Sequence, residues 1–383
     1  MYSIANYGEM ITDNVRIQAF DEALRLAVKP GSVVVDIGTG FGYFALLACK
    51  LGARKVYAIE PDDSINLGRE FAAANGCAEK IEFIQSVSTD AVIPEKADVV
   101  FSDMRGVLPL FQQHLPSIAD ARDRFLAKEG TLIARRDTLW ATIVETQKYH
   151  PATSGPWIEN RHGIDMRAAL PFLTNTWCKA HFTPEHVLAE PCCWAEIDYS
   201  TVLKPGIAGV ADVTVQKAGT AHGIAIWFDT DLIDGIGFSN APGQPEVIYG
   251  NAFFPFAEPV EVAAGDRVQL KLRADLVGAD YTWSWDSRIN AKDDPARIKA
   301  AFRQSTLFGV PLSLARLAKR ASDHLPHLGE NGNIDRLVLE LMAEGVSLGE
   351  ISSRLAAQFP QRFPTAQKAL SHVGDLSLKY DRE

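Results

Sequence analysis

The segment VVVDIGTGFGYFALL (33–47) decides how the first part of this 383-residue chain folds. A short apolar run that contains Asp36 leads into a glycine-rich turn and then into a helical pattern. The glycines of the turn are Gly38, Gly40 and Gly42. Glycine lets the backbone come close to a ligand at the carboxyl end of the first strand, where open α/β sheets bind their ligands. The segment therefore predicts a ligand-binding turn in an open α/β sheet.

Further apolar runs alternate with helical patterns downstream of this turn. Two helical patterns, FALLACKLG (44–52) and SINLGREFAAANG (64–76), each end at a glycine, which is a common helix stop. The strand candidates are SVVVDI (32–37), ARKVYAIE (53–60), KIEFIQ (80–85), ADVVFSD (97–103) and EGTLIAR (129–135). This alternation is typical of a parallel sheet covered by helices. Residues 1–150 are therefore predicted to form an open, mostly parallel α/β domain.

An acid at the end of the second strand, Glu60, indicates a site for a nucleoside-type cofactor. It lies about 18 residues after the last glycine, where a carboxylate can bind the two hydroxyls of a ribose. Tyr43 stands where the dinucleotide fingerprint has its last glycine, so the sequence does not require a pyrophosphate. Glycines that only form a tight strand-to-helix turn are the alternative interpretation.

Beyond the first domain, the pattern changes twice. The strand candidates CCWAEIDYSTV (192–202), ADVTVQ (211–216), HGIAIWFDT (222–230), VIYGNAFFPF (247–256) and DRVQLKLRADL (266–276) are short and separated by Pro and Gly. They predict a β-barrel or sandwich over residues 151–294, with Trp227, Trp283 and Trp285 as packing residues. Residues 295–383 are predicted to be helical, with a capping box formed by Ser347 and Glu350.

Charge and cysteine content limit the possible functions. The 38 Lys plus Arg against 48 Asp plus Glu give a net charge of −10, which argues against a general binder of nucleic acids or anionic membranes. The five cysteines form no C-x-x-C pair and fit a reducing cytoplasm. No signal pattern and no apolar run of roughly 20 residues is present. No histidine has metal-ligand spacing with acids or cysteines, so no metal site is predicted.

The glycine turn and Glu60 resemble the class I S-adenosylmethionine-dependent methyltransferases, and within them the protein arginine methyltransferases. Matching segments are EMITDNVRIQAF (9–20), GARKVYAIE (52–60), WIENRHGIDM (157–166) and AHGIAIWFD (221–229). The resemblance spans about residues 2–290. It implies an α/β methyltransferase sheet of the seven-stranded type, S-adenosyl-L-methionine as cofactor and S-adenosyl-L-homocysteine as product. It also implies a β-barrel and a projecting arm near residues 160–185 that makes a ring-shaped homodimer.

The resemblance also implies which residues contact the cofactor. Arg16 would bind the carboxylate of the methionine part, for which a guanidinium offers two parallel hydrogen bonds. Asp36 would hold the glycine turn and reach the amino group, while Glu60 would bind the ribose. Val87 and Thr89 would contact the adenine, although threonine replaces the family's acidic residue there. A solvated Arg16 and an Asp36 bonded only to backbone remain the alternatives.

The segment FSDMRGVLPLFQQ (101–113) corresponds to the family's acceptor-binding hairpin. Asp103 and Gln112 fall where the family has two glutamates that grip the guanidinium, so one acid is shorter and the other is neutral. That loss weakens paired-charge recognition. Arg105 either neutralises Asp103 or binds a carboxylate on the acceptor. Tyr7 is either a substrate contact or a packing residue.

These observations predict an N-methyltransferase acting on arginine or a guanidine-like nitrogen of a peptide, protein or small metabolite. Methyl transfer depends mainly on alignment, which can account for roughly 7–11 kcal/mol of a barrier. The candidates for alignment are Asp103, Gln112 and Tyr7. Tyr249 and Gly250 stand about where the family has the histidine and tryptophan of a barrel loop. Two alternatives remain: an O-methyltransferase acting on a carboxylate or hydroxyl, and a non-catalytic dimeric scaffold.

The tail lies outside this resemblance. Residues 296–383 contain 12 Lys plus Arg and 9 Asp plus Glu, a net charge of +3, so the rest of the chain carries −13. The pattern resembles helix-turn-helix or winged-helix modules and the peptide-recognising domains of some peptide-modifying enzymes, with Gly345 in the first turn. Three roles stay open: DNA binding, capture of a peptide or protein, and packing that includes dimer stabilisation.

Overall fold

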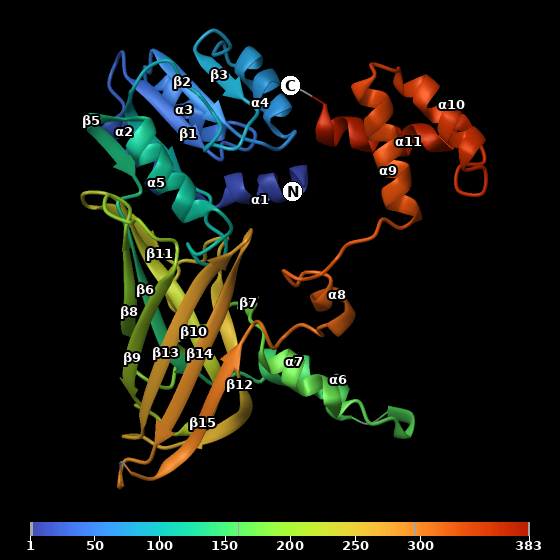
Figure 1. The fold of residues 1–383 in the computed structure, drawn as a ribbon. Helices are drawn as coiled ribbons and strands as arrows, with labels where there is room; N and C mark the ends of the chain where they lie inside the picture. The colour runs from blue at the N-terminus through green and yellow to red at the C-terminus, as the bar shows by residue number, and fades with distance from the viewer. Residues whose placement is uncertain (1–2, 160, 295, 382–383) are drawn as a thin grey trace. The chain divides into compact units, whose positions relative to one another are not determined.

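A computed structural model describes residues 3–159, 161–294 and 296–381 of the chain. The chain divides into two compact units, Met1–Pro311 and Leu312–Glu383, and each is described by itself. Figure 1 shows the helices and strands of both units. None of the helices in the described ranges is both long and apolar enough to cross a membrane.

A parallel sheet forms the first part of the larger unit. Its strand order is β3–β2–β1–β4–β5, and every neighbouring pair is parallel. The strands are β1 (Val33–Ile37), β2 (Lys55–Ile59), β3 (Ile81–Ile84), β4 (Ala97–Ser102) and β5 (Leu126–Ile133). The helices are α1 (Ile4–Thr12), α2 (Asn14–Ala27), α3 (Tyr43–Lys50), α4 (Ile65–Ala74) and α5 (His114–Arg124). All residues of β1 are buried, as expected for a central parallel strand, and the predicted open α/β sheet is confirmed.

The parallel sheet has five strands because the chain leaves it directly after β5. The next strand, β6 (Arg136–Val144), pairs antiparallel with β10 (Gly219–Ile233) and β8 (Cys192–Asp198). The antiparallel domain therefore begins before the boundary expected after residue 150. The sequence could not reveal this, because the partners of β6 lie far along the chain.

Two antiparallel sheets make up the rest of the larger unit. One has the order β7–β12–β10–β6–β8, with β11 on β10, and the other has the order β15–β14–β13–β9. Their remaining strands are β7 (Cys178–Ala180), β9 (Ile207–Thr214), β11 (Ile236–Ser239), β12 (Asn251–Val262), β13 (Arg267–Val277), β14 (Asp280–Asn290) and β15 (Ile298–Ser305). The Phe254 ring of β12 lies 5.1 Å from both the Trp283 and the Trp285 ring of β14. The tryptophans thus pack in the core, as predicted.

The range 295–383 is not helical throughout, which corrects the sequence prediction. Strand β15 falls inside it and pairs antiparallel with β14. Burial alternates only in the middle of β15, and the pairing with β14 decides its conformation.

Helices dominate the smaller unit. They are α8 (Leu314–Ala318), α9 (Glu330–Ala343), α10 (Leu348–Gln358) and α11 (Ala366–Tyr380). Half of the predicted capping box forms: the Ser347 side chain accepts a hydrogen bond from the Glu350 backbone, whereas the Glu350 carboxylate accepts from Arg354 at 2.9 Å. Gly345 ends α9 with φ 75°. Its core consists of Ile334, Val338, Leu341, Ile351, Leu355, Phe363, Ala369 and Val373. This unit therefore has a core of its own.

Candidate functional site

The glycine turn after β1 lets neighbouring side chains come close to the backbone at the carboxyl end of the sheet. Gly38, Gly40 and Gly42 have φ values of 72°, 57° and 86°, a region that favours glycine. A Cβ atom on Gly38 would lie 2.4 Å from Cγ of Met104, and one on Gly40 would lie 2.9 Å from the Tyr7 ring. A side chain at either position would collide with Met104 or Tyr7, so the turn requires glycine there; we call this turn the glycine cradle.

Two acids flank this cradle. Glu60 accepts hydrogen bonds of 3.0 Å from the backbone N–H groups of Gly40 and Asp62. Burial raises the pKa of the Glu60 carboxyl, although these two bonds act to lower it. Asp36 is 3% exposed and accepts a 2.5 Å hydrogen bond from the Thr39 hydroxyl. Burial raises the pKa of Asp36 to about 7, with a smaller opposing effect from Thr39. Asp36 therefore changes its charge near neutral pH.

Arg16 of α2 is buried rather than solvated, which corrects one alternative from the sequence. Its Nε donates to Asp103 Oδ2 at 2.5 Å and to the Tyr249 hydroxyl at 3.2 Å, and its Nη1 donates to the Met10 carbonyl at 2.9 Å. Burial acts to lower the pKa of Arg16, but Asp103 and Tyr249 raise it above its usual value. Among the described residues, none accepts a hydrogen bond from Nη2 of Arg16. The side chain is thus a fixed cation with donors left for a carboxylate.

These residues fit S-adenosylmethionine. The glycines of the turn let a nucleoside approach the backbone, Glu60 offers acceptors for ribose hydroxyls, and Arg16 offers donors for a carboxylate. Val87 and Thr89 lie in the turn after β3, both exposed, and the Thr89 hydroxyl donates to Asp90 at 3.4 Å. Their predicted contact with the adenine stays a prediction.

Asp103 lies just beyond the end of β4, and its carboxylate is closely surrounded. The Tyr249 hydroxyl contacts Oδ1 at 2.6 Å and Oδ2 at 2.9 Å, and Arg105 Nη1 donates to Oδ1 at 3.3 Å. Burial acts to raise the pKa of Asp103, but the charges of Arg16 and Arg105 outweigh it and hold the pKa below its usual range. Asp103 is therefore a permanent anion that joins Arg16 of α2 to the antiparallel domain.

Arg105 does not present its guanidinium to an acceptor. Its side chain is fully buried and donates from Nε and Nη2 to Asp137 at 3.0 and 3.1 Å, and from Nη2 to Thr230 Oγ1 at 3.1 Å. Of the two roles left open by the sequence, the structure supports the contact with Asp103. The proposed grip on an acceptor carboxylate is not supported, because these partners already hold the guanidinium.

Gln112 and Tyr7 occupy different surroundings. Gln112 is exposed in the turn before α5 and has φ 42°, a left-handed conformation that costs a residue with a side chain roughly 1–2 kcal/mol. The Tyr7 hydroxyl lies 3.2 Å from Ser64 Oγ, and its ring meets Phe41 edge-on with centroids 4.8 Å apart. Tyr7 therefore belongs to the packing over the glycine turn.

Sequence reasoning missed several residues around Asp103. Asp137, Tyr199 and Thr230 come from the antiparallel domain and surround Arg105, and Tyr249 was noted only as a departure from the family. No spacing along the chain signals these contacts, because each residue lies on a different strand or loop.

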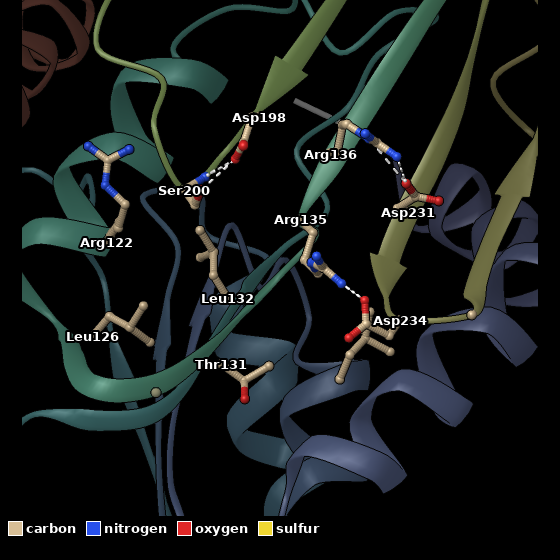
Figure 2. A pocket seen from close by; sticks show the side chains of 13 residues that line it. Arg122, Leu126, Thr131, Leu132, Arg135, Arg136, Asp198, Ser200, Asp231 and Asp234 are labelled. Atoms are coloured by element: carbon tan, nitrogen blue, oxygen red, sulfur yellow. Dashed lines mark hydrogen bonds and ion pairs between the residues drawn. The ribbon is translucent and has the colours of Figure 1, made fainter.

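A separate cavity of about 740 Å³ lies away from the glycine turn. Figure 2 shows its side chains, in which Arg135 pairs with Asp234 and Arg136 pairs with Asp231. Its lining consists of Arg122, Leu126, Gly130, Thr131, Leu132, Arg135, Arg136, Asp198, Ser200, Asp231, Ile233, Asp234 and Gly235. None of the residues predicted for the cofactor or acceptor site lines it.

The parallel sheet, glycine cradle and following antiparallel domain define an S-adenosylmethionine-dependent methyltransferase of class I. The arginine methyltransferase oligomerization subdomain matches residues 135–282, and the ribosomal protein L11 methyltransferase family matches residues 8–135. Protein arginine N-methyltransferase PRMT10 of Oryza sativa subsp. japonica is 38% identical over 304 residues, which cover 68% of this chain and 78% of the relative. The chain belongs to the protein arginine methyltransferase family.

Other relatives agree with this assignment. An arginine N(omega)-methyltransferase of Streptomyces achromogenes is 28% identical over 69% of this chain and 74% of its own length. The chain covers 56% of a probable protein arginine N-methyltransferase 6 of Arabidopsis thaliana, at 28% identity over 60% of this chain. The solved Trypanosoma brucei PRMT1 enzyme-prozyme complex with AdoHcy has a TM-score of 0.72 at 18% identity, over 79% of this chain and 98% of that chain, and shares the fold.

We expect binding of S-adenosylhomocysteine to weaken as the pH falls below about 7, the pKa of Asp36. If Asp36 binds the ammonium group of the ligand as predicted, only its ionised carboxylate forms the ion pair, so the Kd should rise by up to about tenfold for each pH unit. Isothermal titration across this range measures the effect. Asp36→Asn should bind weakly with a much flatter pH dependence, and an equally flat curve for the unchanged protein would contradict the prediction.

Proposed function

We propose that this protein transfers the methyl group of S-adenosylmethionine to a guanidinium nitrogen of arginine. The observation that carries the proposal is the 2.5 Å ion pair between Arg16 and Asp103. It places the predicted acceptor acid directly beside the arginine predicted to hold the cofactor. The names of the family members support arginine over a carboxylate or hydroxyl as the acceptor.

The bound cofactor supplies an electrophilic methyl group on a positively charged sulfur. The acceptor nitrogen forms a bond to this carbon as the carbon–sulfur bond breaks, and the nitrogen loses one proton to solvent. Asp103 does not act as a base, because Arg16 and Arg105 hold its pKa low, and their charges balance that of its carboxylate. Alignment of nitrogen and methyl group is then the main task of the site.

The acceptor is either a peptide or protein arginine or the free amino acid. Relatives named as protein arginine N-methyltransferases favour the former, and the relative named as an arginine N(omega)-methyltransferase favours the latter. Both share the guanidinium that Asp103 would face, and an assay with both kinds of acceptor separates them.

We expect methyl-labelled S-adenosylmethionine to label free arginine or an arginine-containing peptide, and the label to survive mild base. Mass spectrometry of the product locates the methyl group on the guanidinium. A base-labile label would indicate an ester and overturn the acceptor assignment. Intact binding of S-adenosylhomocysteine without transfer to any acceptor in a cell extract would support the scaffold alternative instead.

Replacing Gln112 by Glu should strengthen the grip on the acceptor. The buried cations Arg16 and Arg105 balance the anions Asp103 and Asp137, so the site offers a guanidinium no net negative charge. A hydrogen bond to a charged group contributes about 1.5–3 kcal/mol, so we expect kcat/KM for an arginine acceptor to rise by about tenfold or more.

Gln361→Glu is the matched control for this change. Gln361 is exposed in the smaller unit, so the variant adds the same charge without adding a carboxylate at the site. An equal gain in both variants, or a loss with Gln112→Glu, would contradict the role given to position 112.

We also propose that the protein is a homodimer joined through the arm of residues 160–185 and the helix before it. The arm region contains α6 (Tyr149–Ile158) and α7 (Leu170–Thr174), and residue 160 lies outside the described ranges. Its exposed apolar side chains are Trp157, Ile158, Ile164, Met166 and Phe172. Such a patch needs a partner surface, and a match to the family's oligomerization subdomain supports a second copy as that partner.

The double change Ile164→Asp and Met166→Asp should convert the dimer to a monomer, because it places charge in an apolar interface. Light scattering after size-exclusion chromatography should show the mass falling from twice 41.9 kDa to 41.9 kDa. Leu203→Asp changes an even more exposed apolar residue outside the arm and should leave the mass unchanged. A monomer in the unchanged protein would contradict this proposal.

We place the protein in a reducing cytoplasm. All five cysteines carry free thiols, and Cys49 and Cys77 are buried. Free thiols are typical of proteins in reducing compartments, which supports this placement.

A further inference from the structure

A chain of buried polar side chains continues from Asp103 into the antiparallel domain, and methyl transfer makes no direct use of it. Arg105 donates to Asp137 of β6, and the Tyr199 hydroxyl donates to Oδ2 of the same carboxylate at 2.5 Å. His114 Nε2 lies 3.0 Å from the Tyr199 hydroxyl. All four side chains are at most 5% exposed, so water does not compete with these bonds.

The residues at the two ends of this hydrogen-bonded network, Arg105 and His114, lie at the two ends of one segment of the polypeptide. Arg105 lies near the start of the acceptor segment, by which we mean residues 103–113 of the predicted hairpin 101–113, and His114 follows it as the first residue of α5. Asp137 and Tyr199 therefore bridge residues that enter and leave the segment. The aromatic contacts add to this link, because the Arg105 guanidinium lies 5.8 Å from the Tyr199 ring centroid and the His114 ring meets it edge-on.

The hydrogen-bond directions along the chain are consistent. Burial and the charge of Arg105 lower the pKa of His114 to about 3, so its imidazole is neutral. Since the Tyr199 hydroxyl gives its proton to Asp137, it accepts from His114, which assigns the Nε2–H tautomer. The remaining ring nitrogen, Nδ1, is then a bare acceptor, and it has no hydrogen-bond partner among the described residues.

The backbone between the two anchors is strained. Gln112 has the left-handed φ of 42° two residues before His114. Such a conformation persists only where the surroundings enforce it, and it is common at ligand-binding segments. The bond from His114 to Tyr199 supplies an enforcing contact two residues after the strained residue.

We propose that Asp137 and Tyr199 are positioning residues that, with Arg105 and His114, form a buried bracket around the acceptor segment. The bracket holds Asp103 and Gln112 in position relative to the cofactor. Asp137 and Tyr199 are buried behind the segment, so they act through it rather than by binding the acceptor. The kinetic consequence rests on the proposed function, whereas the ordering of segment 103–113 does not.

Tyr199→Phe tests the bracket, because it removes the bridging hydroxyl and keeps the ring. We expect amide hydrogen exchange in segment 104–113 to accelerate on the order of tenfold in the complex with S-adenosylhomocysteine. Exchange elsewhere and the Kd for that ligand should stay unchanged. With arginine as acceptor, kcat/KM should fall by a similar factor.

Tyr281→Phe is the matched control, because it removes a phenol that donates to the Pro205 carbonyl in the same domain, outside the bracket. If Tyr199→Phe behaves like Tyr281→Phe, or if exchange rises throughout the chain and ligand binding is lost, the proposal is overturned. Faster exchange confined to 104–113 supports the bracket even where no arginine is methylated, so the two proposals fail separately.

A second pair of variants distinguishes loss of the bracket from a general loss of folding. Asp137→Asn alone leaves the buried Arg105 cation with one carboxylate partner fewer and is expected to lower stability. Adding Arg105→Met removes that charge and should restore folding and ligand binding, while segment 104–113 still exchanges faster. Restored protection of the segment in the double variant would overturn the bracket.

Discussion

The buried ion pair between Arg16 and Asp103 is the contact on which the rest of the site depends. Buried charges are tolerated only when they are paired and hydrogen-bonded, and the Tyr249 hydroxyl completes the partners of this carboxylate. The pair joins α2, the end of β4 and the antiparallel domain at one point. The glycine cradle lies beside it, since Met104, the next residue after Asp103, packs over Gly38.

Charge balance distinguishes this site from one built on two carboxylates. Arg16 and Arg105 each find an acid, and those acids, Asp103 and Asp137, are both used within the protein. Gln112 adds an amide but no charge. Recognition of a guanidinium here therefore depends more on the shape and order of the acceptor segment than on attraction between opposite charges. The contacts of Arg105 and His114 with Asp137 and Tyr199 therefore matter for recognition, because they hold this segment in place.

The accuracy of the sequence prediction differed between elements for physical reasons. The turn at Gly38 and the acid at Glu60 were recognisable, because a short segment with its own conformational demands carries them. Strand β6 was assigned to the wrong domain, because its partners β10 and β8 lie far along the chain. The same distance hid the contact of Arg105 with Asp137 and led to the unsupported idea that Arg105 grips an acceptor carboxylate.

The sequence by itself determined the parallel sheet, the cradle and the family, since backbone geometry and hydrophobic periodicity act over a few neighbouring residues. Only the tertiary structure decided which charges meet. Arg16, Asp103 and Tyr249 come from three distant segments, and their pairing follows from the burial of one domain against another. Burial makes each unpaired charge costly, so the fold, rather than the local sequence, selects the partner of each ionised group.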